Sequence, residues 1–306
     1  MKKIFLIIII SCCSSAIYAC DICGCGIGNN YIGILPDFTK HILGLRYRYN
    51  SLQTHLGEGG VPTYLTTMER YKTLELWSGW NIGKKFRVMA SVPYSYNERS
   101  SQGINRFKRG LGDVTLSGYY ELINARKPVF NSKLLVQSLW VGGSIKLPTG
   151  KYNPADKSGT SQNNNLFQLG TASIDYTISA MYDLRLQDIG MNITANYKIN
   201  TANKYHYTYG NKFSLNAQSY YKFRIRQHVM VAPNAGVQFE RSTKDIDDNI
   251  SVDVSGGNLL MGTLGIETAY RKVAIGANWQ TPLSQNLAMG FVKARDRLML
   301  HVSFIL

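Results

Sequence analysis

Residues 191–199 read MNITANYKI, and this stretch decides the fold. In an extended chain, one side would carry Met191, Ile193, Ala195, Tyr197 and Ile199, and the other Asn192, Thr194, Asn196 and Lys198. Successive side chains of a β-strand point to opposite faces, whereas a helical period would scatter these residues around a cylinder. The stretch therefore predicts a strand with one apolar face and one polar face.

The same alternation recurs along the chain and predicts about twelve strands. They lie near residues 41–53, 68–82, 85–97, 111–124, 132–147, 166–184, 187–201, 211–225, 227–241, 256–270, 272–281 and 295–306. Several exceed the ~5–6 residues usual for a strand of a soluble protein. They reach the ~9–11 residues that a tilted strand needs to cross a membrane.

The connections between these segments alternate in length. Short ones include residues 83–85, 125–131 and 271–272, and longer ones include residues 54–67, 98–110, 148–165, 242–255 and 281–294. Outer-membrane barrels combine an even number of strands with short periplasmic turns and long outside loops. With an even number of strands, we expect the two ends of the chain to lie together on the periplasmic side.

A secreted β-sandwich is the alternative, because it also alternates apolar and polar residues. Strand length, loop alternation and aromatic residues near strand ends favour the barrel, since aromatic girdles mark both membrane interfaces. Those aromatic residues include Tyr47, Tyr49, Trp80, Tyr94, Tyr96, Tyr119, Tyr120, Tyr220, Tyr221, Tyr270 and Trp279. The predicted fold class is an all-β, antiparallel transmembrane β-barrel in the outer membrane of a Gram-negative bacterium, with outer-membrane lipid as a partner.

The chain begins with MKKIFLIIIISCCSSAIYA, which is typical of a secretory signal peptide. Two lysines precede an apolar run that is far shorter than the ~20 residues of a membrane-spanning helix. The predicted organisation is a signal peptide at 1–19, a Cys-rich periplasmic or plug segment at 20–40, and the barrel at 41–306. The net charge is +15, but an exported chain without a nucleic-acid motif argues against a nucleic-acid partner.

Three cysteines follow the predicted cleavage site, at Cys20, Cys23 and Cys25. Converging thiolates favour copper(I) and also bind zinc, and tetrahedral zinc would need a fourth ligand such as His41, Asp21 or the Cys20 amine. The sequence therefore predicts a soft-metal site at Cys20, Cys23, Cys25 and His41. A disulfide with one thiol left over, and acylation of Cys20, stay open as alternatives.

Two further stretches carry a family resemblance. GLGDVTLSGYYEL at residues 110–122 and GGSIKLPTGKYN at residues 142–153 resemble motifs of an outer-membrane family named as transporters of a phenol meta-degradation pathway. The resemblance implies a porin-like β-barrel and no phenol-specific residue. The head CDICGCGIGNNYIGILP at residues 20–36 is similar to that of uncharacterised Bacteroidota outer-membrane proteins. LPTG is expected to end a strand, because Pro148 has no amide hydrogen to donate.

The polar faces predict a lumen that carries charges of both signs. Its inward residues would include Arg46, Arg48, Glu75, Asp113, Glu121, Lys146, Asp175, Lys198, Glu240 and Glu267. They could form cross-strand ion pairs or line a polar passage. A barrel of about twelve strands is intermediate between filled and open barrels. We therefore expect a narrow channel or transporter for a small solute, with a structural or assembly protein as the alternative.

Enzymatic activity is not expected. His301 and Ser303 share the inward face of the last segment, but no nucleophile motif surrounds them. Residues 203–211 read NKYHYTYGN and predict an outside loop, whose Tyr205, His206, Tyr207 and Tyr209 either contact a ligand or only cap the barrel. The solute and the oligomeric state do not follow from the sequence.

Overall fold

The computed structural model describes residues 40–129, 133–156, 165–225 and 229–306. Twelve long strands form the wall: β1 (Ile42–Thr54), β2 (Thr67–Ile82), β3 (Phe86–Ser101), β5 (Val114–Val129), β6 (Lys133–Leu147), β7 (Asp175–Leu186), β8 (Ile189–Ile199), β10 (Lys212–Tyr221), β12 (Val229–Ser242), β15 (Gly257–Tyr270), β16 (Val273–Leu287) and β17 (Lys293–Ile305). Within the described part of the chain, no helix is long and apolar enough to cross a membrane.

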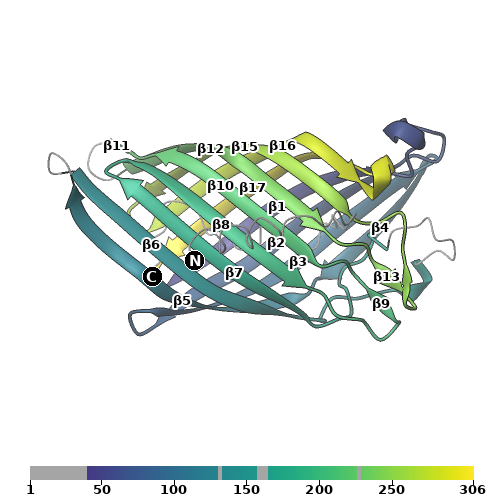
Figure 1. Cartoon of the computed structure of the whole chain (residues 1–306), viewed down its shortest axis with the longest axis horizontal. Helices are drawn as coiled ribbons and strands as arrows, with labels where there is room; N and C mark the ends of the chain where they lie inside the picture. The colour runs from purple at the N-terminus through teal and green to yellow at the C-terminus, as the bar shows by residue number, and fades with distance from the viewer. Residues whose placement is uncertain (1–39, 130–132, 157–164, 226–228) are drawn as a thin grey trace, which may run out of the picture.

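These strands close into a ring in chain order, and every pairing is antiparallel. The ring closes where β1 pairs with β17, with Arg46 opposite His301. Figure 1 shows the tilted strands, with the short turns at the left end of the barrel and the longer loops at the right. The first and last strands meet at the short-turn end, where the Leu306 amide donates to the His41 carbonyl at 2.9 Å.

The strands are turned apolar side out. Along β15, for example, Leu264 and Ile266 are exposed while Thr263 and Glu267 are buried. In water, apolar side chains stabilise a fold when they are buried. An outer surface made of apolar side chains therefore indicates an apolar surrounding. The alternation read from residues 191–199 thus becomes an apolar outer surface and a largely polar interior, as predicted for a membrane barrel.

The short elements lie at the ends of the wall. β4 (Ile104–Leu111) pairs only with β3 and extends that hairpin, and β11 (Phe223–Ile225) continues the β10–β12 hairpin. β9 (Tyr207–Thr208), β13 (Ile246–Asp247) and β14 (Ile250–Ser251) form a separate small sheet at the long-loop end. Three single-turn 3₁₀ helices complete the described elements: η1 (Glu58–Gly60), η2 (Pro154–Asp156) and η3 (Ala288–Gly290).

The predicted number of strands is confirmed, and four boundaries are wrong. The predicted short connection at 125–131 is mostly strand, because β5 runs to Val129. The predicted strand at 166–184 begins only at Asp175, because the residues before it fold into the barrel. The predicted loop at 98–110 is mostly hairpin, formed by the end of β3 and by β4. The predicted loop at 281–294 is largely taken up by β16, which runs to Leu287, and by the start of β17.

Candidate functional site: the closed mouth of the barrel

Residues 165–173, the last part of the connection between β6 and β7, fold into the barrel at its long-loop end. Residues 165–173 of this connection, hereafter the inward segment, are buried except for partly buried Ala172. A surface loop normally stays in water, because its backbone groups need hydrogen-bond partners. The inward segment is therefore held by specific contacts, which come from several sides of the wall.

One anchor is apolar. Leu166 is 4 % exposed and packs into a buried cluster formed by inward side chains and the β16–β17 connection. The cluster also contains Leu52, Tyr71, Leu259, Met261, Leu287, Ala288, Val292 and Ala294. Removal of one leucine side chain from such a site costs about 2–5 kcal/mol, so Leu166 fastens the segment to the wall made by β1, β2 and β15–β17.

A second anchor is made by cations of the neighbouring β3–β4 hairpin. Lys108 on β4 donates to the Phe167 carbonyl and the Asp156 carboxylate, and the Arg99 guanidinium lies 4.5 Å from the Phe167 ring centre. Asn97 donates to the Gln168 carbonyl at 3.0 Å. Burial lowers the pKa of Lys108, and its ion pair with Asp156 opposes that shift.

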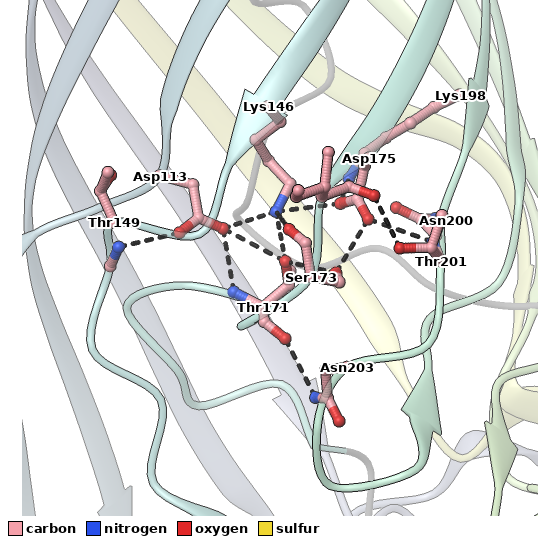
Figure 2. A network of polar contacts seen from close by, with 12 residues as sticks. Asp113, Lys146, Thr149, Thr171, Ser173, Asp175, Lys198, Asn200, Thr201 and Asn203 are labelled. Atoms are coloured by element: carbon pink, nitrogen blue, oxygen red, sulfur yellow. Dashed lines mark hydrogen bonds and ion pairs between the residues drawn. The ribbon is translucent and has the colours of Figure 1, made fainter.

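The third anchor is the polar network of Figure 2, which joins β6 and β7 to the inward segment. Lys146 lies 2.6 Å from Asp113 and 2.9 Å from Asp175, and Lys198 on β8 lies 3.1 Å from Asp175. Asp113 also accepts the Thr171 amide at 2.9 Å and the Gly150 amide at 2.9 Å. Two carboxylates and two ammonium groups therefore balance in charge where β7 begins.

A layer of tyrosines closes over the segment. Tyr207 and Tyr209 are buried beside Tyr152 and Val252, Tyr207 donates to Asp245, and Tyr209 donates to the Asn165 carbonyl at 3.0 Å. The predicted outside loop at 203–211 is thus a cap on the mouth. Its tyrosines pack and hydrogen-bond within the protein, which fits the capping interpretation. Of the four residues singled out in this loop, Tyr205 is partly buried and His206 is exposed.

Below the mouth, ion pairs cross between strands. Glu75 lies 3.6 Å from Arg46 and 3.3 Å from Arg48. Glu240 receives two hydrogen bonds from Arg297, at 2.6 and 3.2 Å, and Lys212 lies 3.6 Å away. A buried carboxylate is costly unless it is paired in this way.

Two cavities accompany this arrangement. One of about 670 Å³ adjoins the inward segment and is lined by residues including His55, Glu69, Arg99, Arg106, Leu166 and Phe291. A smaller one of about 50 Å³ lies deeper, between amide side chains and two arginines: Asn216, Gln218, Gln238, Asn278, Gln280, Arg48 and Arg297. The interior wall is thus polar between the mouth and the other end.

Toward the short-turn end the inner wall becomes apolar on one side. Ile42, Trp77, Met89, Tyr119, Trp140 and Met181 form a buried cluster on β1–β7. Trp77 lies against Gly44, so close that a Cβ atom at Gly44 would overlap its indole ring. Bulky side chains therefore fill one side of this part of the interior.

All ten predicted inward charges lie inside the barrel. The ion-pair interpretation is confirmed for Arg46, Arg48 and Glu75, and for Asp113, Lys146, Asp175, Lys198 and Glu240. Glu121 is buried, and Glu267 lies 3.9 Å from His301. Ser303 donates to the Ala274 carbonyl at 3.5 Å, so its hydroxyl is turned to the backbone.

The predicted metal site lies mainly outside the described residues, which do not include Cys20, Cys23 or Cys25. His41 is described: its Nδ1 accepts the Asn81 amide at 3.1 Å, and its ring centre lies 5.1 Å from that of Trp80. Among the described residues, no group of three or more His, Cys, Asp or Glu side chains could hold a metal ion.

The inward segment was not predicted from the sequence. Leu166, Phe167 and Leu169 interrupt a polar stretch and imitate the start of a strand. The sequence offers one signal, the glycines Gly150 and Gly170. In the structure their backbones lie so close that a Cβ on either would meet the other, but residue spacing alone does not show which two glycines approach.

No protein-family model and no curated protein matches this chain. Among solved structures, the chain is similar to an outer membrane channel from Pseudomonas putida F1, with 15 % identity, a TM-score of 0.58, and coverage of 91 % of this chain and 98 % of that one. It is also similar to the β domain of the Bordetella autotransporter Brka, with 10 % identity, a TM-score of 0.51, and coverage of 87 % and 100 %. At these identities the likeness establishes the fold: the chain has the fold of outer-membrane β-barrels.

Proposed function

We propose that this protein is a narrow outer-membrane channel for a small polar solute, held closed at its outer mouth by the inward segment. The observation that carries the proposal is the position of residues 165–173, which are buried across the mouth above a lumen lined by amides and paired charges. The apolar outer surface supports a place in the membrane, and the outer-membrane channel among the structural neighbours supports transport.

The direction of the chain in the membrane follows from the loops. Outer-membrane barrels place short turns in the periplasm, so the mouth closed by the inward segment would face the outside. The amide side chains of the smaller cavity offer both donors and acceptors, and its two arginines are each paired with a glutamate. The solute is therefore defined by size and polarity, and the resemblance to the phenol-transporter family adds no residue that would narrow it further.

The test is conductance of the purified protein in planar bilayers. We expect low conductance for the unaltered protein and a severalfold rise for Leu166→Ser combined with Phe167→Ser. The double variant removes the Leu166 packing and the ring contact of Phe167 with Arg99, and so weakens two of the three anchors of the inward segment. Val61→Ser is the matched control, since Val61 is 60 % exposed in the β1–β2 loop. If the double variant is folded and stays silent, the channel proposal is wrong.

A structural or assembly protein is the second candidate, favoured by the Cys-rich sequence at residues 20–25. In that case the head would hold copper(I) or zinc, carry a lipid, or bind a periplasmic partner. Mass spectrometry of the mature N-terminus separates these cases, because acylation, a disulfide and a bound metal each give a different mass.

A further inference from the structure

The short-turn end of the barrel carries charge of almost one sign. Eight exposed cations lie at its turns and strand ends, hereafter the basic rim: Lys84, Lys85, Arg126, Lys127, Lys133, Arg224, Arg271 and Lys272. Among the described residues of all the short turns, one side chain is acidic: Asp188 of the β7–β8 turn, which lies 3.9 Å from Arg224. Neither the channel proposal nor the interior ion pairs use these residues.

The opposite end differs. Its loops mix both signs, as in the ion pair of Lys244 with Asp253 at 2.7 Å and that of Lys108 with Asp156. The net charge of +15 is therefore unevenly placed, and its excess gathers at the end that short turns assign to the periplasm.

The basic rim is spread around the barrel. Its members lie in or beside the β2–β3, β5–β6, β10–β12 and β15–β16 turns, at the left end of the barrel in Figure 1. A partner protein docked on one side would require a cluster on one side. A ring matches a ligand that surrounds the barrel, as membrane lipid does.

Exposed aromatic and apolar side chains adjoin the basic rim on the outer surface of the barrel. Ile82 and Phe86 flank the Lys84–Lys85 turn and are 61 % and 41 % exposed, and Tyr270 precedes Arg271 and is 48 % exposed. The Arg271 guanidinium lies 5.2 Å from the Tyr270 ring centre. Aromatic rings prefer the membrane interface, so the cations beside them are at the depth of lipid headgroups.

We propose that the basic rim binds the anionic headgroups of phospholipids in the periplasmic leaflet. Each lysine or arginine near an anionic membrane surface contributes about 1 kcal/mol, which is about a fivefold change in affinity. The proposal uses the membrane orientation assigned above and is independent of conduction, because lipid binding is read without any current.

The test is the composition of the lipids that stay bound to the full-length protein. The protein is purified from mixed micelles of phosphatidylglycerol and phosphatidylcholine, and its bound lipids are counted by mass spectrometry. We expect a preference for phosphatidylglycerol that falls about fivefold for each charge removed in Lys84→Gln/Lys85→Gln and in Arg271→Gln/Lys272→Gln. The preference should also weaken with salt.

Lys151→Gln/Lys204→Gln is the matched control, since both lysines are exposed at the long-loop end. Heat-modifiable mobility on gels shows that each variant is folded. An unchanged preference in both rim variants, or an equal loss in the control, overturns the proposal. So does unchanged lipid binding together with lost binding of polyglutamate, which would make the basic rim a docking surface for an acidic polypeptide.

Discussion

The ammonium group of Lys146 lies 2.6 Å from the carboxylate of Asp113 and connects the end of β6 to the start of β5. These two residues belong to the two stretches that carry the family resemblance, GLGD and KLPTG. Backbone contacts strengthen the link: Thr149 donates to the Gly112 carbonyl at 2.8 Å, and Gly150 donates to Asp113. The two motifs thus form one junction, and the inward segment is bound to it through Thr171.

Lys146→Met should destabilise the barrel and loosen the mouth. Asp113 and Asp175 would lose their shared cation, and breaking a buried pair costs about 3–5 kcal/mol; partial exposure of Lys146 places the expected loss at the lower end, about 3 kcal/mol. Urea unfolding in micelles, followed by heat-modifiable mobility, measures it. Lys151→Gln should leave stability unchanged, and a stable Lys146→Met would contradict the role of the junction.

Gly190→Ala should destabilise the barrel through a clash. Tyr220 on β10 covers Gly190 on β8 so closely that an added Cβ overlaps its ring, and the Tyr220 hydroxyl donates to Asp183 at 3.0 Å. Overpacking of this kind costs about 1–3 kcal/mol. Adding Tyr220→Ala to the variant should remove the clash, so the two substitutions should be non-additive. Strict additivity in a double-mutant cycle would argue against it.

Leu264→Arg should show whether the outer surface faces lipid. Leu264 is 56 % exposed near the middle of β15, and an arginine at the middle of a lipid face costs about 2–4 kcal/mol. Tyr64→Arg is the control, because Tyr64 is 81 % exposed in the β1–β2 loop and surface substitutions change stability by about 0.5 kcal/mol or less. Equal, small effects of both variants would point to a barrel in water.

The Cys-rich head should bind one soft metal ion if the predicted site exists. The measurement is metal content of the mature protein after equilibration with copper(I) or zinc, compared with that of Cys23→Ser/Cys25→Ser. Loss of two thiolates should abolish tight binding, whereas His41→Asn tests the fourth ligand. Equal metal content in all three proteins would rule the site out.

The strands could be predicted because their cause is local. Alternation in stretches such as residues 191–199 reports which side chains meet lipid and which meet the lumen, and that pattern needs no knowledge of partners. The predicted strand boundaries were wrong where tertiary contacts outweighed this alternation. Leu166 and Phe167 look like the start of β7, yet burial against Leu259 and Arg99 holds them inside the mouth.

The sequence by itself determined the all-β class, the twelve-strand ring and the inward charges, since each follows from a two-residue period and from loop lengths. Only the tertiary structure decided that residues 165–173 are buried in the mouth, that Asp113 and Lys146 join two distant motifs, and that exposed cations form a rim at the short-turn end. These features depend on residues that are distant in the sequence. Pairing of β5 with β6 brings Lys146 to Asp113, whereas Leu166 meets side chains of β1 and β15 together because the ring closes between β1 and β17.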